Sequence, residues 1–176
     1  MNKPLQTGTF PEVQVKKVSM EELYPLMEEI LSSGGSFSLT VTGSSMFPFI
    51  LGGRDQVTLS PVDRPLKKLD LPLYRRRNGQ FVLHRIVRVE KDGSYTCCGD
   101  HQWELERGLQ EDQMIALATA YVRKGKHLTN RNILYRIYRV LWTRIIPLRP
   151  YLFRILDKWR NRKILVFRKN RHGKTQ

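Results

Sequence analysis

The chain has 176 residues, of which 40% are hydrophobic, and its formal net charge is +15. This length allows one compact domain with appendages, and the apolar fraction excludes both a disordered chain and an integral membrane bundle. Residues 1–17 lack the apolar core of a signal peptide, and no stretch reaches the roughly 18 uninterrupted apolar residues of a spanning helix. The sequence therefore predicts a cytoplasmic or peripheral membrane protein.

The positive charge is concentrated in the last third of the chain. From Tyr121 onward there are 17 Lys or Arg residues and one acidic residue, Asp157. Because the whole chain has 31 basic and 16 acidic residues, the part before Tyr121 has 14 basic and 15 acidic residues and is nearly neutral. A basic tail of this kind favours an anionic partner, either lipid head groups or nucleic acid.

The first 36 residues are predicted to form a lead-in and one amphipathic helix. Residues 1–17 have an irregular or strand-like pattern. Ser19 is a candidate N-cap, and apolar residues follow at three- and four-residue spacings until the Ser-Ser-Gly-Gly sequence at 32–35. Pro25 falls early enough in this helix to be tolerated.

Residues 37–126 have the alternating pattern of short strands. Asn78-Gly79 and Asp92-Gly93 supply hairpin turns between apolar runs. The predicted strands cover residues 37–41, 56–60, 71–76, 81–89, 94–98 and 114–122. Short strands at this spacing predict a mainly β domain, either a small barrel or a sandwich.

The tail, residues 127–176, is predicted to contain two basic helices at 130–146 and 150–168, separated by Pro147 and Pro150. Its first helix has an apolar stripe flanked by arginines: Ile133, Leu134, Ile137, Val140, Leu141 and Ile145. This combination favours an interfacial helix on anionic lipid. Two alternatives remain: the stripe packs on the β domain, or the tail binds nucleic acid through its aromatic residues, which is the least favoured.

Three short motifs contain side chains that could carry hydrolytic chemistry. Ser45 follows a strand and Gly43, so it is exposed in a turn whose amides can converge on an oxyanion. A serine needs a base, and His84, in the apolar run 81–87, is a candidate with a pKa near neutrality. Asp100 follows Gly99 after a strand and could orient His84 as the third member of a triad.

Taken together, these motifs resemble the signal peptidase I group, and most closely its archaeal and endoplasmic-reticulum branch, which uses serine and histidine. The matching elements span roughly residues 38–126: Gly43-x-Ser45-Met46-x-Pro48, Gly-Arg-Asp-Gln-Val at 53–57, His84-Arg85-Ile86-Val87 and Gly99-Asp100. The resemblance implies a mostly β catalytic domain that cleaves an extended signal- or leader-peptide-like segment after small residues, without a cofactor.

Carried over by residue, the resemblance implies Ser45 as nucleophile, His84 as general base and Asp100 as the acidic residue. Glu106 is a second candidate for that acidic position. Met46 and Pro48 would shape the nucleophile turn and contact substrate. The oxyanion hole would consist of the Ser45 amide with help from Ser44.

Two other functions were considered. A non-catalytic module could hold a peptide by strand addition on the same fold. A relative of the self-cleaving repressor peptidases would share the Gly-x-Ser-Met pattern but would need a lysine where this chain has His84. The histidines and the Cys97-Cys98 pair lack metal-ligand spacing, and the sequence predicts no metal site and no particular oligomeric state.

Overall fold

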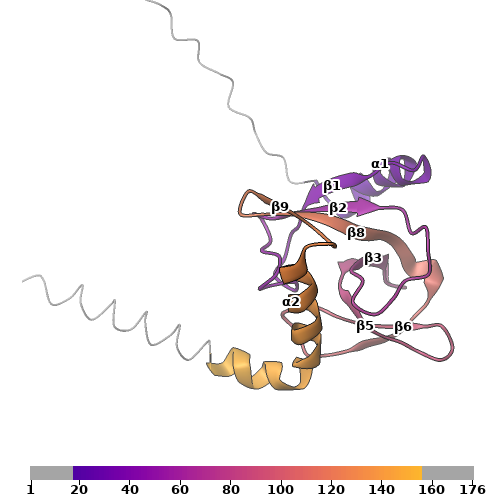
Figure 1. Cartoon of the computed structure of the whole chain (residues 1–176). Helices are drawn as coiled ribbons and strands as arrows, with labels where there is room; N and C mark the ends of the chain where they lie inside the picture. The colour runs from indigo at the N-terminus through magenta and orange to yellow at the C-terminus, as the bar shows by residue number, and fades with distance from the viewer. Residues whose placement is uncertain (1–17, 156–176) are drawn as a thin grey trace, which may run out of the picture.

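A computed structural model describes residues 18–155 of the chain. As the sequence predicts, the protein is mainly β, with a curled half-barrel sheet, a helix on its N-terminal side and helices after the last strand (Figure 1). The lead-in 1–17 and most of the predicted helix 150–168 lie outside the described residues, although residues 149–155 are helical. Within the described part, no helix is long and apolar enough to cross a bilayer.

Along the chain, one helix comes first, nine strands follow it, and a second helix comes after the last strand. The helices are α1 (Met20–Ser32) and α2 (Ile133–Arg144), with 3₁₀ turns at Glu111–Gln113 and Ile146–Leu148. The strands are β1 (Phe37–Thr40), β2 (Gln56–Ser60), β3 (Pro72–Arg75), β4 (Phe81–Leu83), β5 (Arg85–Val89), β6 (Tyr95–Cys98), β7 (Glu106–Leu109), β8 (Met114–Arg123) and β9 (Lys126–Thr129).

Helix α1 begins as predicted. The Ser19 hydroxyl accepts a hydrogen bond from the Glu22 amide, and the Glu22 carboxylate accepts one from the Ser19 amide, which completes a capping box. Met27 and Leu31 are buried on the inner face of the helix and pack into the larger hydrophobic core. Because apolar residues recur at helical spacing, one side of α1 covers that core.

The larger sheet is antiparallel and has the order β1-β2-β8-β3-β4, with β9 also paired to β8. The ten-residue strand β8 therefore holds the sheet together. Strand β9 was not predicted from the sequence, and it runs across the predicted domain boundary at residue 126. In this sheet β4 pairs only with β3, so its other edge faces no strand in residues 18–155.

The predicted strand 81–89 is divided in two. Strand β4 pairs with β3 in the larger sheet, whereas β5 pairs with β6 in a separate three-stranded sheet of order β5-β6-β7. The residue between the two strands is His84. The chain leaves one sheet and enters the other there, so the imidazole is placed at the junction of the two sheets.

Helix α2 packs on the β domain through an aromatic face. The Tyr135 ring stacks on Phe49 at 4.4 Å, and the Tyr135 hydroxyl accepts a hydrogen bond from Arg85. The indole of Trp142 donates to the Asp100 carbonyl oxygen at 2.8 Å. The aromatic face of α2 therefore contributes to the hydrophobic core of the β domain, whereas Ile133, Leu134, Ile137 and Leu141 of the predicted stripe are exposed.

Candidate active site

Ser45 lies in an irregular turn between β1 and β2. The Phe47 amide donates to the Ser44 carbonyl oxygen at 3.0 Å, and the Ile50 amide donates to the Met46 carbonyl oxygen at 2.9 Å. Gly43, which precedes this turn, has φ of 80°, a value that favours glycine. The turn thus holds the half-buried Ser45 side chain at the end of β1.

The Gly99-Asp100-His101 loop closes over this turn. The His101 amide donates to the Ser45 carbonyl oxygen at 2.7 Å. A Cβ atom on Gly99 would lie 2.7 Å from the same oxygen, so glycine is required for this close approach. Within residues 18–155 the amides of Ser44, Ser45 and Met46 donate no hydrogen bond, which leaves them free to stabilise an oxyanion.

His84 and Ser45 line the same cavity, of about 220 Å³. The His84 side chain comes from the strand junction and is only 4% exposed. Burial lowers its pKa to about 4, which corrects the near-neutral value predicted from the sequence. The imidazole is therefore neutral at pH 7 and can accept a proton.

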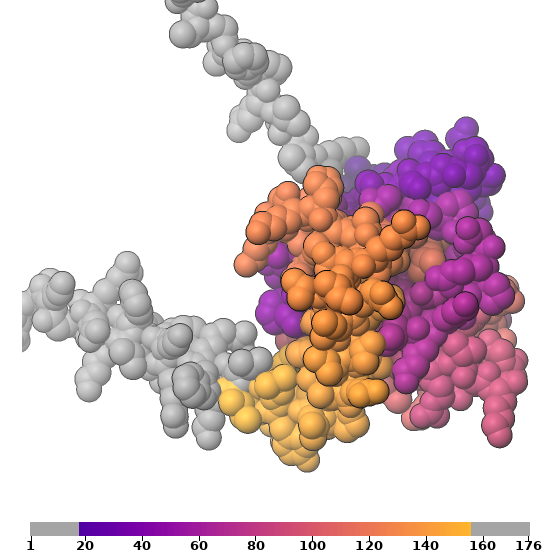
Figure 2. Space-filling view, in the orientation of Figure 1, coloured from indigo at the N-terminus to yellow at the C-terminus, as the bar shows by residue number. Residues whose placement is uncertain are grey.

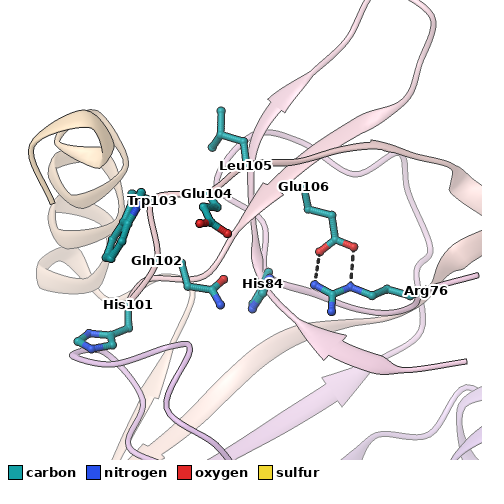
Figure 3. A pocket seen from close by; sticks show the side chains of 8 residues that line it. All are labelled: Arg76, His84, His101, Gln102, Trp103, Glu104, Leu105 and Glu106. Carbon is teal, nitrogen blue, oxygen red and sulfur yellow. Dashed lines mark hydrogen bonds and ion pairs between the residues drawn. The ribbon is translucent and has the colours of Figure 1, made fainter. Parts of the chain in front are cut away.

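A chain of three polar side chains holds the other side of the His84 ring. The Tyr74 hydroxyl lies 3.3 Å from His84 Nδ1 and donates to Glu106 Oε2 at 2.7 Å. Arg76 donates to both Glu106 oxygens, from Nε at 2.7 Å and from Nη2 at 2.6 Å. Figure 3 shows the paired Arg76 and Glu106 with His84 beside them.

This arrangement fixes which nitrogen of His84 carries the proton. Burial raises the pKa of Glu106, but the hydrogen bonds from Arg76 and Tyr74 outweigh it and bring the pKa below its usual range. An ionised carboxylate only accepts hydrogen bonds, so the single Tyr74 proton points to Glu106. The Tyr74 oxygen must then accept from Nδ1–H of His84, which leaves Nε2 as the unprotonated, basic nitrogen.

Asp100 does not make the hydrogen bond to His84 that a triad would require. Its carboxylate is fully buried and accepts from Arg85 Nε at 3.0 Å and from Arg85 Nη2 at 2.8 Å, with a further bond from Tyr138. Within residues 18–155 the hydrogen-bond partner of His84 Nδ1 is Tyr74, which in turn contacts Glu106, the second candidate for the acidic position. Asp100 instead neutralises a buried arginine beneath the active-site loop.

A second cavity, of about 460 Å³, adjoins the first and shares Arg76, His84 and Gln102 with it (Figure 3). Its remaining lining comes from the segment before β7 and from the first residue of that strand: His101, Trp103, Glu104, Leu105 and Glu106. The His84 ring thus lies where the two cavities meet. A ligand occupying both would pass directly over it.

Of the other residues predicted to contact the substrate or the oxyanion, only some lie at the cavity that Ser45 and His84 line. Met46 is buried and lines the smaller cavity, whereas Pro48 is not among its lining residues and its carbonyl oxygen accepts from Arg123. Ser44 is exposed beside Ser45. Among residues 18–155, no group of three or more His, Cys, Asp or Glu side chains could hold a metal ion.

Tyr74 and Arg76 escaped the sequence analysis. Tyr74 belongs to β3 and Arg76 directly follows it, both within the strand predicted at 71–76, but their bonds to Glu106 join residues 32 and 30 positions apart. Strand β7, which begins at Glu106, was not predicted either. The predicted strand 71–76 held a useful signal, because side chains two residues apart in a strand, such as those of Tyr74 and Arg76, point to the same face.

The depressed pKa of His84 predicts an acid-sensitive fold. Between pH 6.5 and about 4 the unfolded chain binds a proton that the folded protein excludes, so stability is lost as the pH falls through this window. The expected loss is about 3 kcal/mol. Urea unfolding at pH 7, 5.5 and 4 should show a smaller decline for His84→Asn than for the wild type. His127→Asn, at an exposed position on β9, is the control and should follow the wild type. Parallel curves for all three proteins would contradict the prediction.

The buried ion pair predicts a structural role for Asp100. Replacing Asp100 by asparagine leaves the Arg85 charge buried without its counterion, and we expect a loss of about 3–5 kcal/mol in the free energy of unfolding. Asp112→Asn is the control, because its pair with Arg77 is largely exposed and should contribute less than about 1 kcal/mol. Unchanged stability with lost turnover would instead indicate a catalytic role for Asp100.

Comparison of the chain with protein-family models, with curated proteins and with solved structures found no match.

Proposed function

We propose that the protein is a serine endopeptidase in which Ser45 is the nucleophile and His84 the general base. The observation that carries this proposal is the shared cavity, which is lined by the half-buried Ser45 and by a buried, neutral histidine whose Nδ1 side is already occupied. A serine hydroxyl is a poor nucleophile until a neighbouring base removes its proton, and this pairing supplies the base.

The reaction follows from the roles of the two residues. His84 Nε2 accepts the Ser45 proton as Oγ attacks the scissile carbonyl carbon, and the negative oxygen that forms is stabilised by the free amides of the turn. His84 then gives the proton to the leaving amine as the C–N bond breaks. Water repeats the sequence on the acyl-enzyme, and the carboxylate product and free serine are released.

The substrate we propose is an extended peptide segment, as in a signal or leader peptide. Residues 80–84 line the cavity, and β4 within this segment has an edge that faces no strand in the described residues. Val41 and Thr42, at the end of β1, line the same cavity. A peptide added to the edge of β4 would satisfy that edge's backbone groups and bring one of its carbonyl groups to Ser45. The resemblance to the signal peptidase I group favours small side chains before the cleaved bond.

A fluorophosphonate probe tests the proposal, because it bonds to an activated serine through phosphorus with loss of fluoride. We expect mass spectrometry to find the adduct on Ser45, with no adduct in Ser45→Ala and normal labelling in Ser44→Ala. The labelling rate should fall as the pH drops through about 4, the pKa of His84. An unlabelled protein that still binds extended peptides would support the non-catalytic peptide-binding module instead.

A further inference from the structure

Helix α2 has two apolar faces, and residues 18–155 cover only one of them. Tyr135, Tyr138 and Trp142 point to the β domain, where they form the contacts described above. Since successive residues turn by about 100° around a helix, the opposite face is formed by four aliphatic side chains. These are Ile133, Leu134, Ile137 and Leu141, which are 61%, 74%, 49% and 57% exposed.

The 3₁₀ turn Ile146–Leu148 and the helical residues 149–155 also have one buried side and one exposed side. Arg149 and Phe153 are buried against the Gly99–Gln102 loop and its neighbours, with Arg149 donating to the Gly99 and Gln102 carbonyl oxygens. Leu148, Tyr151 and Ile155 are more than half exposed. We call the seven exposed side chains of α2 and this segment the apolar ridge. Figure 2 shows α2 and this segment as a continuous band on the surface.

The charge around the apolar ridge has one sign. Arg131, Arg136, Arg144 and Arg154 are exposed, and none forms an ion pair within residues 18–155. Between Asp112 and Asp157 the sequence contains no acidic residue. A surface that combines exposed aliphatic side chains with uncompensated arginines matches a bilayer interface, which offers apolar acyl chains beneath anionic head groups.

We infer that the apolar ridge docks the protein on the surface of an anionic membrane. A second copy of the chain is a poorer occupant, because pairing two ridges would bring arginines together without acidic partners. Nucleic acid is also poorer, because bases stack on aromatic side chains and α2 turns its aromatic residues inward.

Docking would also place the active site relative to the bilayer, a consequence that rests on the proposed function. The inner face of the tail bonds to the Gly99–Gln102 loop through Trp142 and Arg149, and the His101 amide of that loop bonds to the Ser45 carbonyl oxygen. The docked helix is thus joined to the nucleophile turn by direct hydrogen bonds. Peptides that emerge from the membrane surface are the substrates that this arrangement would favour.

The test is co-sedimentation of the full chain with vesicles of phosphatidylglycerol and phosphatidylcholine in equal parts, and with phosphatidylcholine alone. We expect binding only to the anionic vesicles, and weaker binding as salt increases. Leu134→Gln with Leu141→Gln should weaken binding roughly a hundredfold. Arg136→Gln with Arg144→Gln should weaken it roughly twentyfold at low salt.

Matched controls come from exposed residues elsewhere on the surface. One control removes two exposed apolar side chains away from the ridge, by Leu26→Gln with Val89→Gln. The other removes two exposed arginines, by Arg77→Gln with Arg88→Gln. Each should change vesicle binding by less than about twofold. Equal effects of ridge and control variants, or binding that ignores anionic lipid, would overturn the inference. The inference would also be overturned if the protein sedimented as a dimer without vesicles and if the double substitution Leu134→Gln with Leu141→Gln dissociated that dimer.

The same variants separate this inference from the proposed function. None of the substituted residues lines either cavity, so probe labelling of Ser45 and cleavage of a short water-soluble peptide should be unchanged in the ridge variants. Vesicle binding without labelling of Ser45 would support the docking surface and contradict the proposed peptidase activity. Labelling of Ser45 without vesicle binding would support the peptidase activity and contradict the docking surface.

Discussion

Replacing Ser45 by alanine should reduce peptide cleavage by roughly a millionfold, because a nucleophile and its base act as a unit. The fold should survive. The Ser45 side chain forms no hydrogen bond within residues 18–155, and the turn is held by backbone bonds and by the Arg123 side chain, which donates to the Pro48 carbonyl oxygen. The residual rate would come from the free amides of the turn and from binding alone.

Single-turnover cleavage of a peptide, followed by mass spectrometry, measures this loss. Thermal unfolding of the same sample shows that the variant is folded. Ser44→Ala is the matched control, because Ser44 is the exposed neighbour of Ser45 and the substitution keeps its backbone amide. Cleavage by Ser45→Ala at a rate near that of the wild type would rule out Ser45 as nucleophile.

The sequence predicts the elements of the β domain better than it predicts how they pair. Helix α1 and the alternation of strands are local features, so capping residues and period-two patterns are enough to find them. The run 81–89 is mostly apolar on both sides of His84-Arg85, and its pattern gives no sign that the chain changes sheets at His84. That break depends on which strands pair, which is decided by contacts distant in sequence.

The candidate site shows the same limit. Ser45 and His84 are recognisable because each lies in a local pattern that resembles a known family. The partner of His84 is not local: Tyr74 lies ten residues before it and Glu106 follows 22 residues after it, on a strand the sequence analysis missed. Asp100 was the more obvious candidate for the acidic partner of His84, but it forms an ion pair with the buried Arg85. The sequence does not show that Arg85 is buried, and only a buried arginine requires such a counterion.

Helix α2 packs on the β domain through a different face from the stripe that the sequence predicts. Its apolar residues were counted as one stripe, yet the aromatic positions that flank that stripe form the buried face of α2. The aromatic residues of α2 and its aliphatic stripe lie on different sides of the helix, so the apolar pattern alone does not decide which side is buried. Only the packing of Tyr135, Tyr138 and Trp142 shows which face is left exposed.

Replacing Glu106 by glutamine should lower kcat for peptide cleavage by roughly 10³–10⁴-fold with little change in KM, the cost expected when a catalytic histidine is held in the wrong tautomer. The carboxylate accepts the Tyr74 proton, whereas an amide can donate to the Tyr74 oxygen. Tyr74 would then donate to His84 Nδ1, and the proton of the neutral ring would move to Nε2, the nitrogen that must accept from Ser45. Glu106→Gln therefore blocks the base without removing it.

Nitrogen-15 NMR of the His84 imidazole shows which ring nitrogen carries the proton. If Glu106 had only a structural role, its substitution would not change this tautomer. We expect Nδ1–H and a bare Nε2 in the wild type, and the opposite tautomer in Glu106→Gln. Tyr74→Phe, which deletes the acceptor for Nδ1–H, should also lower kcat. Glu104→Gln is the matched control, because Glu104 lines the same cavity but is exposed and has no hydrogen-bond partner in residues 18–155, so its loss should change kcat by less than about twofold. A wild-type ring protonated at Nε2, or full activity in Glu106→Gln with a reversed tautomer, would show that the Tyr74–Glu106 pair does not position His84 as a base.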